Sequence, residues 1–353
     1  MFITLQLNQQ KTIARNPNPK HLYFDNDYGD VLTVRFDDVQ CQEYCKIKYL
    51  PGLPKNAWRT VSNGLICTAT FLYFGHFIVD NNIYLWNPLV EKYKTLPDSP
   101  LPFSETKWKA LAFGFVPEIN DYVVVHLVKP CLHLARGERD PHSVFIGVYS
   151  LKANSWKKLS QENVFVRDIR YEDAVFVNGA AFWIGKSLDY RKIILCYDTK
   201  TAMLRQISLP NYVKDRPCIL VIHPVGQSSL AYFLWDRREV WAHIVDYVDM
   251  WLLKYDSVNE FSWEKKMNIN INEDIREEGF NDTRVDFLGA RNNGEPILAR
   301  SYDLVSYNLD TNEANDFVHL WDSWIPYLYY ERVFAPPFLI CPFVETLALL
   351  NID

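Results

Sequence analysis

The sequence predicts an all-β protein built from repeated four-stranded units, a β-propeller. Three observations support this: its length, its aromatic-rich composition and a strand unit that recurs along the chain. The chain has 353 residues, more than one compact core usually holds, so it needs either two domains or a closed array of repeats. Aromatic residues make up 15% of the chain, whereas only 13 of its 353 residues are glycine. This favours strands packed by rings over a glycine-rich nucleotide-binding fold.

The recurring unit is an apolar strand that ends in an aromatic residue, followed by a turn and a second strand. Six aromatic anchors mark it: Phe36, Trp86, Tyr149, Tyr197, Tyr255 and Tyr307. Each is followed by a residue that can hydrogen-bond to its own backbone in a turn: Asp37, Asn87, Ser150, Asp198, Asp256 and Asn308. The anchors are 48 to 63 residues apart, which suits a propeller blade with long loops. We therefore predict six blades, with seven as the alternative.

The other strands are expected between the anchors, in the apolar segments 64–71, 110–116, 121–128 and 174–185. Asn178-Gly179 separates two apolar runs and predicts a two-residue hairpin turn, because such turns need positive φ at both positions. A second hairpin is predicted over 286–301, whereas 131–143 and 270–286 are polar and predicted as rim loops. Helical periodicity is rare. We expect terminal strands to close the ring, with 2–7 and 343–350 as candidates.

Charge and cysteine content limit the classes of partner and the cellular locations to be expected. The net charge is −6 with no long basic run, which argues against binding to nucleic acid or to an anionic membrane. Seven scattered cysteines suggest reduced thiols and a cytoplasmic or nuclear location, or both. No signal peptide or membrane span is expected. The partner is therefore expected to be a protein or a small molecule.

Catalytic and metal-binding signatures are not found in the sequence. There is no nucleophile elbow, P-loop, dinucleotide fingerprint or His-Glu-x-x-His, so we expect no enzyme activity, no catalytic residues and no cofactor. Zinc-binding residue types occur in one loop and one short pair, without the paired spacings of a zinc site: Cys131, His133, Glu138 and His142, and Cys41 with Cys45. No metal site is predicted.

The tryptophans divide into expected core and expected surface. Five are predicted to fill the space between blades from equivalent positions of the repeat: Trp86, Trp156, Trp183, Trp251 and Trp263. Trp235 and Trp241 instead flank a charged segment, a mixture typical of interface hot spots, although a buried strand next to a charged turn is an alternative. Together with two arginines of the 131–143 loop, the candidate protein-binding residues are Trp235, Arg237, Arg238, Trp241, Arg136 and Arg139.

Short motifs spread over nearly the whole chain resemble, in sequence and in order, those of one plant protein family. They are SNGLIC (62–67), LWNP (85–88), AFGFVPEINDYVVV (112–125), VYSLKANSWKKL (148–159), VFVNGAAFWIG (175–185), MWLLKYDSVNEFSWEKK (250–266) and FVETLALL (343–350). On these motifs the sequence resembles the plant F-box-associated domain family, which includes F-box/kelch-repeat-like and S-locus F-box-like proteins.

The resemblance implies a kelch-like propeller over residues 21–353 that recognises a protein substrate for an SCF E3 ubiquitin ligase through its rim loops. In that family an F-box precedes the propeller and binds a Skp-type adaptor. Residues 1–20 resemble only the segment that follows an F-box, and they are a candidate for the ring-closing strand. The adaptor and cullin are therefore expected as partners only if an F-box is supplied. Two alternatives are a protein-binding propeller without a ligase link and a propeller enzyme acting on a small molecule.

Overall fold

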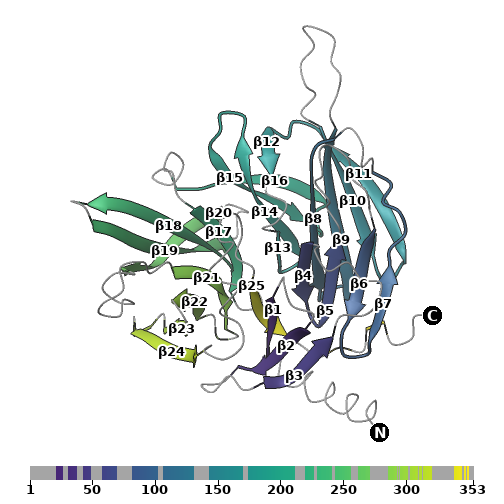
Figure 1. The fold of residues 1–353 in the computed structure, drawn as a ribbon. Coiled ribbons are helices and arrows are strands. Elements are labelled where there is room, and N and C mark those ends of the chain that lie inside the picture. Colours follow the sequence, from purple (N-terminus) through teal and green to yellow (C-terminus); the bar gives the residue numbers. More distant parts are fainter. Residues whose placement is uncertain are drawn as a thin grey trace.

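The computed structural model describes most of the chain, and all the elements it describes are β-strands (Figure 1). The described residues are 21–26, 31–37, 43–48, 58–69, 82–101, 106–130, 143–169, 174–210, 219–225, 229–240, 243–255, 261–270, 285–291, 293, 295–300, 303–308, 310–311, 313–319, 338–343, 346 and 348–349.

The described strands form five sheets, one of them eight-stranded; dividing that sheet at the parallel bridge between β21 and β25 gives six antiparallel groups, numbered here along the chain. Group 1 contains β25 (Phe338–Phe343), β1 (His21–Asn26), β2 (Val31–Phe36) and β3 (Glu43–Lys48). Group 2 contains β4 (Trp58–Ser62), β5 (Leu65–Ala69), β6 (Ile83–Asn87) and β7 (Lys92–Thr95). Group 3 contains β8 (Thr106–Val116), β9 (Asp121–Pro130), β10 (Val144–Ser150) and β11 (Ser155–Gln161).

The remaining groups follow the same plan. Group 4 contains β12 (Val166–Ile169) and β13 (Val175–Val177), which both pair with β14 (Ala180–Ser187), then β15 (Lys192–Asp198) and β16 (Met203–Ser208). Group 5 contains β17 (Ile219–Val225), β18 (Ser229–Val240), β19 (His243–Tyr255) and β20 (Phe261–Asn270). Group 6 contains β21 (Val285–Ala290), β22 (Pro296–Arg300), β23 (Asp303–Asn308) and β24 (Glu313–His319).

The innermost strands contact one another in a closed circuit. β25 contacts β4, β4 contacts β8, β8 contacts β12 and β13, β13 contacts β17, and β17 contacts β21. β21 returns to β25 through a parallel bridge between Gly289 and Ile340. Figure 1 shows the groups arranged around a common centre. The propeller fold is confirmed, and the number of blades stays a prediction.

The ring closes where β25 pairs with β1, from His21 opposite Phe343 to Asn26 opposite Phe338. Terminal strands therefore close the ring, but the prediction that 343–350 supplies the strand is wrong at Ala348 and Leu349, and of this segment Phe343 is the last residue of β25. Ala348 and Leu349 lie in a turn, and Leu349 is buried in the apolar cluster between groups 2 and 3. Packing thus takes this segment away from the sheet. The other candidate, 2–7, lies outside the described residues.

The predicted turn chemistry is confirmed at four of the anchors. Each anchor lies at or next to the last residue of the third strand of its group, and Trp86, Tyr149, Tyr197 and Tyr307 are at most 2% exposed. The next side chain accepts a backbone N–H from two or three residues further on, which fixes the turn. The donor-to-acceptor distances are 3.0 Å for Leu89 N to Asn87, 3.0 Å for Ala153 N to Ser150, 2.8 Å for Lys200 N to Asp198 and 2.8 Å for Asp310 N to Asn308.

Both predicted hairpins are also present. Asn178 and Gly179 have φ of 48° and 76°, as a two-residue primed turn requires, and join β13 to β14. Asn63 and Gly64 join β4 to β5 with the same backbone geometry, at φ of 45° and 82°, a turn that the sequence analysis did not single out. The hairpin of β21 and β22 is closed by the Arg291 N–H, which donates to the Glu295 carbonyl at 2.8 Å.

Three apolar clusters fill the spaces between neighbouring groups. Leu85 and Phe113 lie in the cluster between groups 2 and 3, and Trp183 lies between groups 3 and 4. Tyr232 lies in the cluster between groups 4 and 5. Because groups 3 and 4 are each covered on both faces, the strands β9, β14 and β15 are buried at consecutive residues rather than at alternate ones.

The five tryptophans predicted as core occupy three different positions of the repeat, so the prediction of one equivalent position is wrong. Trp86 and Trp251 lie on third strands, Trp183 on a second strand, and Trp156 and Trp263 on fourth strands. The last two are true equivalents, since each donates its Nε1–H to a carbonyl at the outer edge of the preceding group. The distances are 2.8 Å from Trp156 to Pro97 and 3.0 Å from Trp263 to Ser208.

Candidate functional site

The strand order gives the propeller two different faces. Strands alternate in direction within each group, and the innermost strands β21 and β25 run parallel. Connections between first and second strands and between third and fourth strands therefore leave on one face, named here the turn face. Connections between second and third strands and between successive groups leave on the other, the loop face.

The turn face is held together by hydrogen bonds and ion pairs between neighbouring groups. Tyr122 donates its hydroxyl to the Asn63 carbonyl at 2.7 Å, and Asn87 Nδ2 donates to the Thr346 carbonyl at 2.9 Å. Lys200 Nζ lies 2.5 Å from Glu118 Oε1, and this hydrogen bond lowers the pKa of Glu118. These contacts join groups 1 to 4 through short turns.

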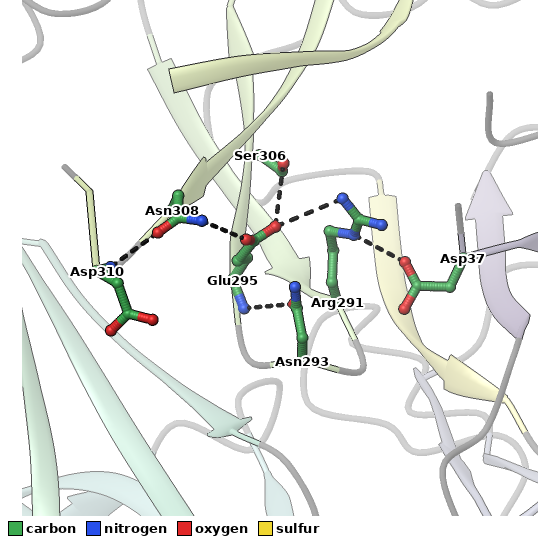
Figure 2. A network of polar contacts seen from close by, with 7 residues as sticks. All are labelled: Asp37, Arg291, Asn293, Glu295, Ser306, Asn308 and Asp310. Atoms are coloured by element: carbon green, nitrogen blue, oxygen red, sulfur yellow. Dashed lines mark hydrogen bonds and ion pairs between the residues drawn. The ribbon is translucent and has the colours of Figure 1, made fainter. Parts of the chain in front are cut away.

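Groups 6 and 1 are joined on the turn face by a charged network (Figure 2). Arg291, in the turn between β21 and β22, donates its Nε–H to Asp37 at 2.8 Å and lies 3.4 Å from Glu295. Glu295 also accepts bonds from Asn308 at 3.1 Å and from Ser306 at 3.4 Å. Asp37 follows β2, so here the turn residue after the anchor contacts the last group of the chain. We name these five residues the closure network.

The loop face carries the long connections. The chain leaves the described strands on this face for 49–57, 70–82, 131–143, 211–218, 271–284 and 320–337. By contrast, β1 begins at His21 on the turn face and β25 ends there at Phe343. The segment that precedes the propeller is therefore attached to the face opposite the long connections.

Three of the six predicted binding residues lie on a strand that ends on the loop face. Trp235, Arg237 and Arg238 are in β18, paired with Val248, Asp246 and Val245 of β19. The alternative was a buried strand next to a charged turn, and its charged turn is wrong at Arg237 and Arg238, because β18 continues to Val240. Three further predicted residues lie outside the described residues: Trp241, Arg136 and Arg139. Nothing in the structure tests the binding role of the six.

β18 and β19 extend beyond their neighbours as a two-stranded hairpin. Pairing with β17 ends at Trp235, and pairing with β20 ends at Tyr247. The described stretches 236–240 and 243–246 pair only with each other, and Figure 1 shows the two strands projecting from the ring.

A second surface on the loop face was not predicted from the sequence. It consists of Phe165, Arg167, Leu188 and Tyr190, named here the aromatic patch. Phe165 directly precedes β12, while Leu188 and Tyr190 lie in the turn between β14 and β15. The guanidinium carbon of Arg167 lies 4.0 Å from the centroid of the Tyr190 ring, the geometry of a cation–π contact.

The turn that carries the aromatic patch is fixed by its own hydrogen bonds. Ser187 N donates to the Arg191 carbonyl at 2.9 Å, and Tyr190 N donates to the Ser187 carbonyl at 3.0 Å. The Ser187 hydroxyl donates to Asp189, which is paired with Arg191 at 3.0 Å. The patch is therefore presented by an ordered turn.

Buried ionisable groups lie between the sheets and away from both faces. His126 is fully buried, and its Nδ1 lies 2.8 Å from the Ser99 hydroxyl. Burial lowers the pKa of His126 to about 3 and raises that of the Cys196 thiol to about 12. A neutral imidazole and a protonated thiol packed in the core serve stability rather than chemistry. Among the described residues, no three His, Cys, Asp or Glu side chains gather as metal ligands.

Comparison with known proteins gives a family match over most of the chain. Residues 39–296 match the family described as F-box associated beta propeller domain. The F-box protein At3g08750 of Arabidopsis thaliana is 26% identical over 134 residues, which cover 38% of this chain and 34% of that protein. The match thus spans about a third of that relative. Within the described part of the chain, no helix has the length and apolarity to cross a bilayer.

Solved structures with similar folds are distant in sequence. A DUF4784 family protein from Bacteroides caccae is 12% identical with a TM-score of 0.48, covering 88% of this chain and 73% of its own. The β-propeller domain of the Trilobed protease from Pyrococcus furiosus is 12% identical with a TM-score of 0.41, covering 75% and 73%.

Proposed function

Because the chain belongs to the F-box associated β-propeller domain family, we propose that it binds a protein target through its loop face for presentation to an SCF ubiquitin ligase. In this proposal the propeller recognises the target and performs no chemistry itself. The Skp-type adaptor and the cullin are reached only through an F-box ahead of the propeller. The place of action is the cytoplasm or the nucleus, where reduced cysteines persist.

One observation supports the proposal: the two faces of the propeller carry different parts of the chain. The chain enters the ring at His21 on the turn face, while the long connections leave from the loop face. An F-box attached ahead of β1 would therefore sit opposite the loop face. Variable binding residues are commonly borne by loops on a rigid scaffold, so a target on the loop face would not compete with the adaptor for space.

The test compares target capture by variants of the two faces. The immobilised chain is incubated with plant extract, and captured proteins are quantified by mass spectrometry. The loop-face variant replaces 131–142 with a Gly-Ser linker and carries Arg237→Ser and Arg238→Ser. The matched turn-face variant, Glu118→Ala with Lys200→Ala, removes an exposed ion pair.

We expect a small set of proteins to be captured by the wild type and the turn-face variant and lost with the loop-face variant. Both variants should keep the wild-type melting temperature, which excludes unfolding as the cause. Equal capture by all three chains would exclude the 131–142 loop, Arg237 and Arg238 as the target site, and loss only with the turn-face variant would contradict binding through the loop face.

The ligase link has a separate test. We expect purified Skp-type adaptor to bind a fusion that carries a related F-box ahead of Met1 and not to bind residues 1–353 alone. The fused chain should lower the abundance of a captured protein in plant cells, and a proteasome inhibitor should restore it. Unchanged abundance with adaptor bound would favour the alternative of a binding propeller without a ligase link.

A further inference from the structure

We infer that the aromatic patch of Phe165, Arg167, Leu188 and Tyr190 is a docking site for an acidic protein segment that carries an aromatic or aliphatic side chain. The inference rests on the proposed function, because it names one binding surface on the loop face and the chemistry of its partner.

The patch concentrates exposed apolar side chains. Six large hydrophobic side chains are exposed among the described residues, and three of them are Phe165, Leu188 and Tyr190, at 46%, 40% and 63% exposure. Val166 pairs with Ser187, so the residues next to this pair, Phe165 and Leu188, lie side by side at the end of the strands. Clustered exposed apolar side chains on a soluble protein mark interaction sites, whereas single ones do not.

The backbone at Tyr190 supports a binding role. Tyr190 has φ of 64°, a left-handed conformation that is unfavourable for a bulky side chain and is usually taken by Gly, Asn or Asp. A structural turn at this position is better served by one of those residues. The sequence instead places a 63% exposed tyrosine here, where it contributes to binding rather than to the core.

A β-bulge holds the arginine over the ring. The pairing of β12 with β14 shifts register between Val166 and Asp168, so that Arg167 is the extra residue. Bulges redirect a side chain and are common beside functional sites. The bulge brings the Asp168 carbonyl to 2.8 Å from where a Cβ on Gly185 would lie, so only glycine fits at that position.

The basic residues of the patch indicate an acidic partner. The two segments that form the patch, 165–169 and 185–192, contain four basic residues and two acidic ones, whereas the whole chain has 37 basic and 43 acidic residues. One of the two acids, Asp189, is paired with Arg191 at 3.0 Å. A guanidinium stacked on a ring keeps its in-plane N–H donors for a carboxylate. An acidic segment with an apolar side chain therefore complements both the basic residues around the patch and the rings of Phe165 and Tyr190.

The experiment selects peptides from a phage-displayed random library on the immobilised full chain and measures the affinity of the enriched peptides by fluorescence anisotropy. The patch variant combines Phe165→Ser with Tyr190→Asn, because Asn tolerates positive φ and preserves the turn. Arg167→Gln removes only the charge. The matched control is Tyr93→Ser, which removes a tyrosine of 43% exposure on β7.

Enriched peptides should combine Asp or Glu with Trp, Phe or Leu. Their affinity should fall at least about tenfold with the patch variant and about fivefold with Arg167→Gln, should weaken with added salt, and should be unchanged with Tyr93→Ser. Failure to enrich peptides, enrichment of neutral or basic peptides, equal binding to the patch variant, or displacement of the peptides by single-stranded RNA at equal concentration would overturn the inference.

The outcome is separable from that of the proposed function. If the patch variant still captures the same plant proteins as the wild type, the loop face remains the target site and the aromatic patch is refuted as part of it. If acidic peptides bind the patch while no plant protein depends on the loop face, the patch stands and the proposed function falls.

Discussion

Replacing Arg291 with Leu should open the ring where its last and first groups meet. The arginine lies between two carboxylates that are mostly shielded from water: the side chains of Asp37 and Glu295 are 6% and 14% exposed, and that of Arg291 is 15% exposed. Leucine keeps most of the volume and removes the cation. The two acids then face each other across the junction of groups 6 and 1.

The expected cost is about 3 kcal/mol of the free energy of unfolding, the lower end of the range for breaking a buried ion pair. The lower end applies because Glu295 keeps its bonds from Ser306 and Asn308. Lys254→Leu is the control, since Lys254 and Glu264 form an exposed pair at 2.6 Å with side chains 59% and 39% exposed. Exposed pairs contribute little to stability, because water screens them, so the control should unfold at nearly the same urea concentration as the wild type.

Urea unfolding measures both costs, and hydrogen exchange with mass spectrometry locates them. In Arg291→Leu, protection should be lost first in β1, β2, β21 and β22, while β9 and β14 stay protected. Adding Asp37→Leu and Glu295→Leu should recover part of the loss, because no buried carboxylate then lacks a cation. A cost under about 1 kcal/mol, or a uniform loss of protection, would show that the closure network does not hold the ring.

Three further predictions concern the core. The pKa of His126 is lowered by burial from 6.5 to about 3, so its contribution to stability is complete above pH 6.5 and is lost as pH falls toward 3; urea midpoints against pH should fall less steeply for His126→Leu. Trp183→Phe removes the 3.0 Å bond from the indole N–H to the Leu111 carbonyl and should cost about 1–3 kcal/mol in urea unfolding, and a change below that range would refute the role of this bond. Burial raises the pKa of the Cys67 and Cys196 thiols, so iodoacetamide at pH 8 should label them only after unfolding; rapid labelling of the native chain, located by peptide mapping, would show that they are accessible.

The fold could be predicted from the sequence because each repeat is marked by residues that are neighbours in the chain. An aromatic at the end of a strand and an Asx or Ser residue after it determine burial and turn together, as at Tyr197 and Asp198. The closing strand could not be predicted, because an apolar segment near the C-terminus can either pair with a strand of the sheet or pack on the core, and the sequence does not distinguish the two. Leu349 packs into the core between groups 2 and 3, which the apolar pattern of 343–350 does not distinguish from a strand.

The candidate site was only partly predictable. The binding role of Arg237 and Arg238 stays a prediction, and the alternative of a charged turn at these residues was wrong, because a charged run looks the same in a turn and in a projecting hairpin. The aromatic patch was missed because it depends on register: the pairing of Val166 with Ser187 places Phe165 beside Leu188, and the bulge at Arg167 lies next to this pair, with the guanidinium over the Tyr190 ring. Isolated exposed aromatics carry no periodic signal that would mark them in one sequence.

Closure by the last strand also governs how the protein is made. β1 leaves the ribosome early, but its partner β25 is made some 300 residues later, since His21 pairs with Phe343. At about 5–20 residues per second this delay is about 15–60 s, during which the backbone edge of β1 is open to pairing with other chains. Synthesis that stops before residue 338 leaves open edges on both β1 and β21. Incomplete chains are therefore expected to depend on chaperones and to be the main source of aggregation when this protein is expressed.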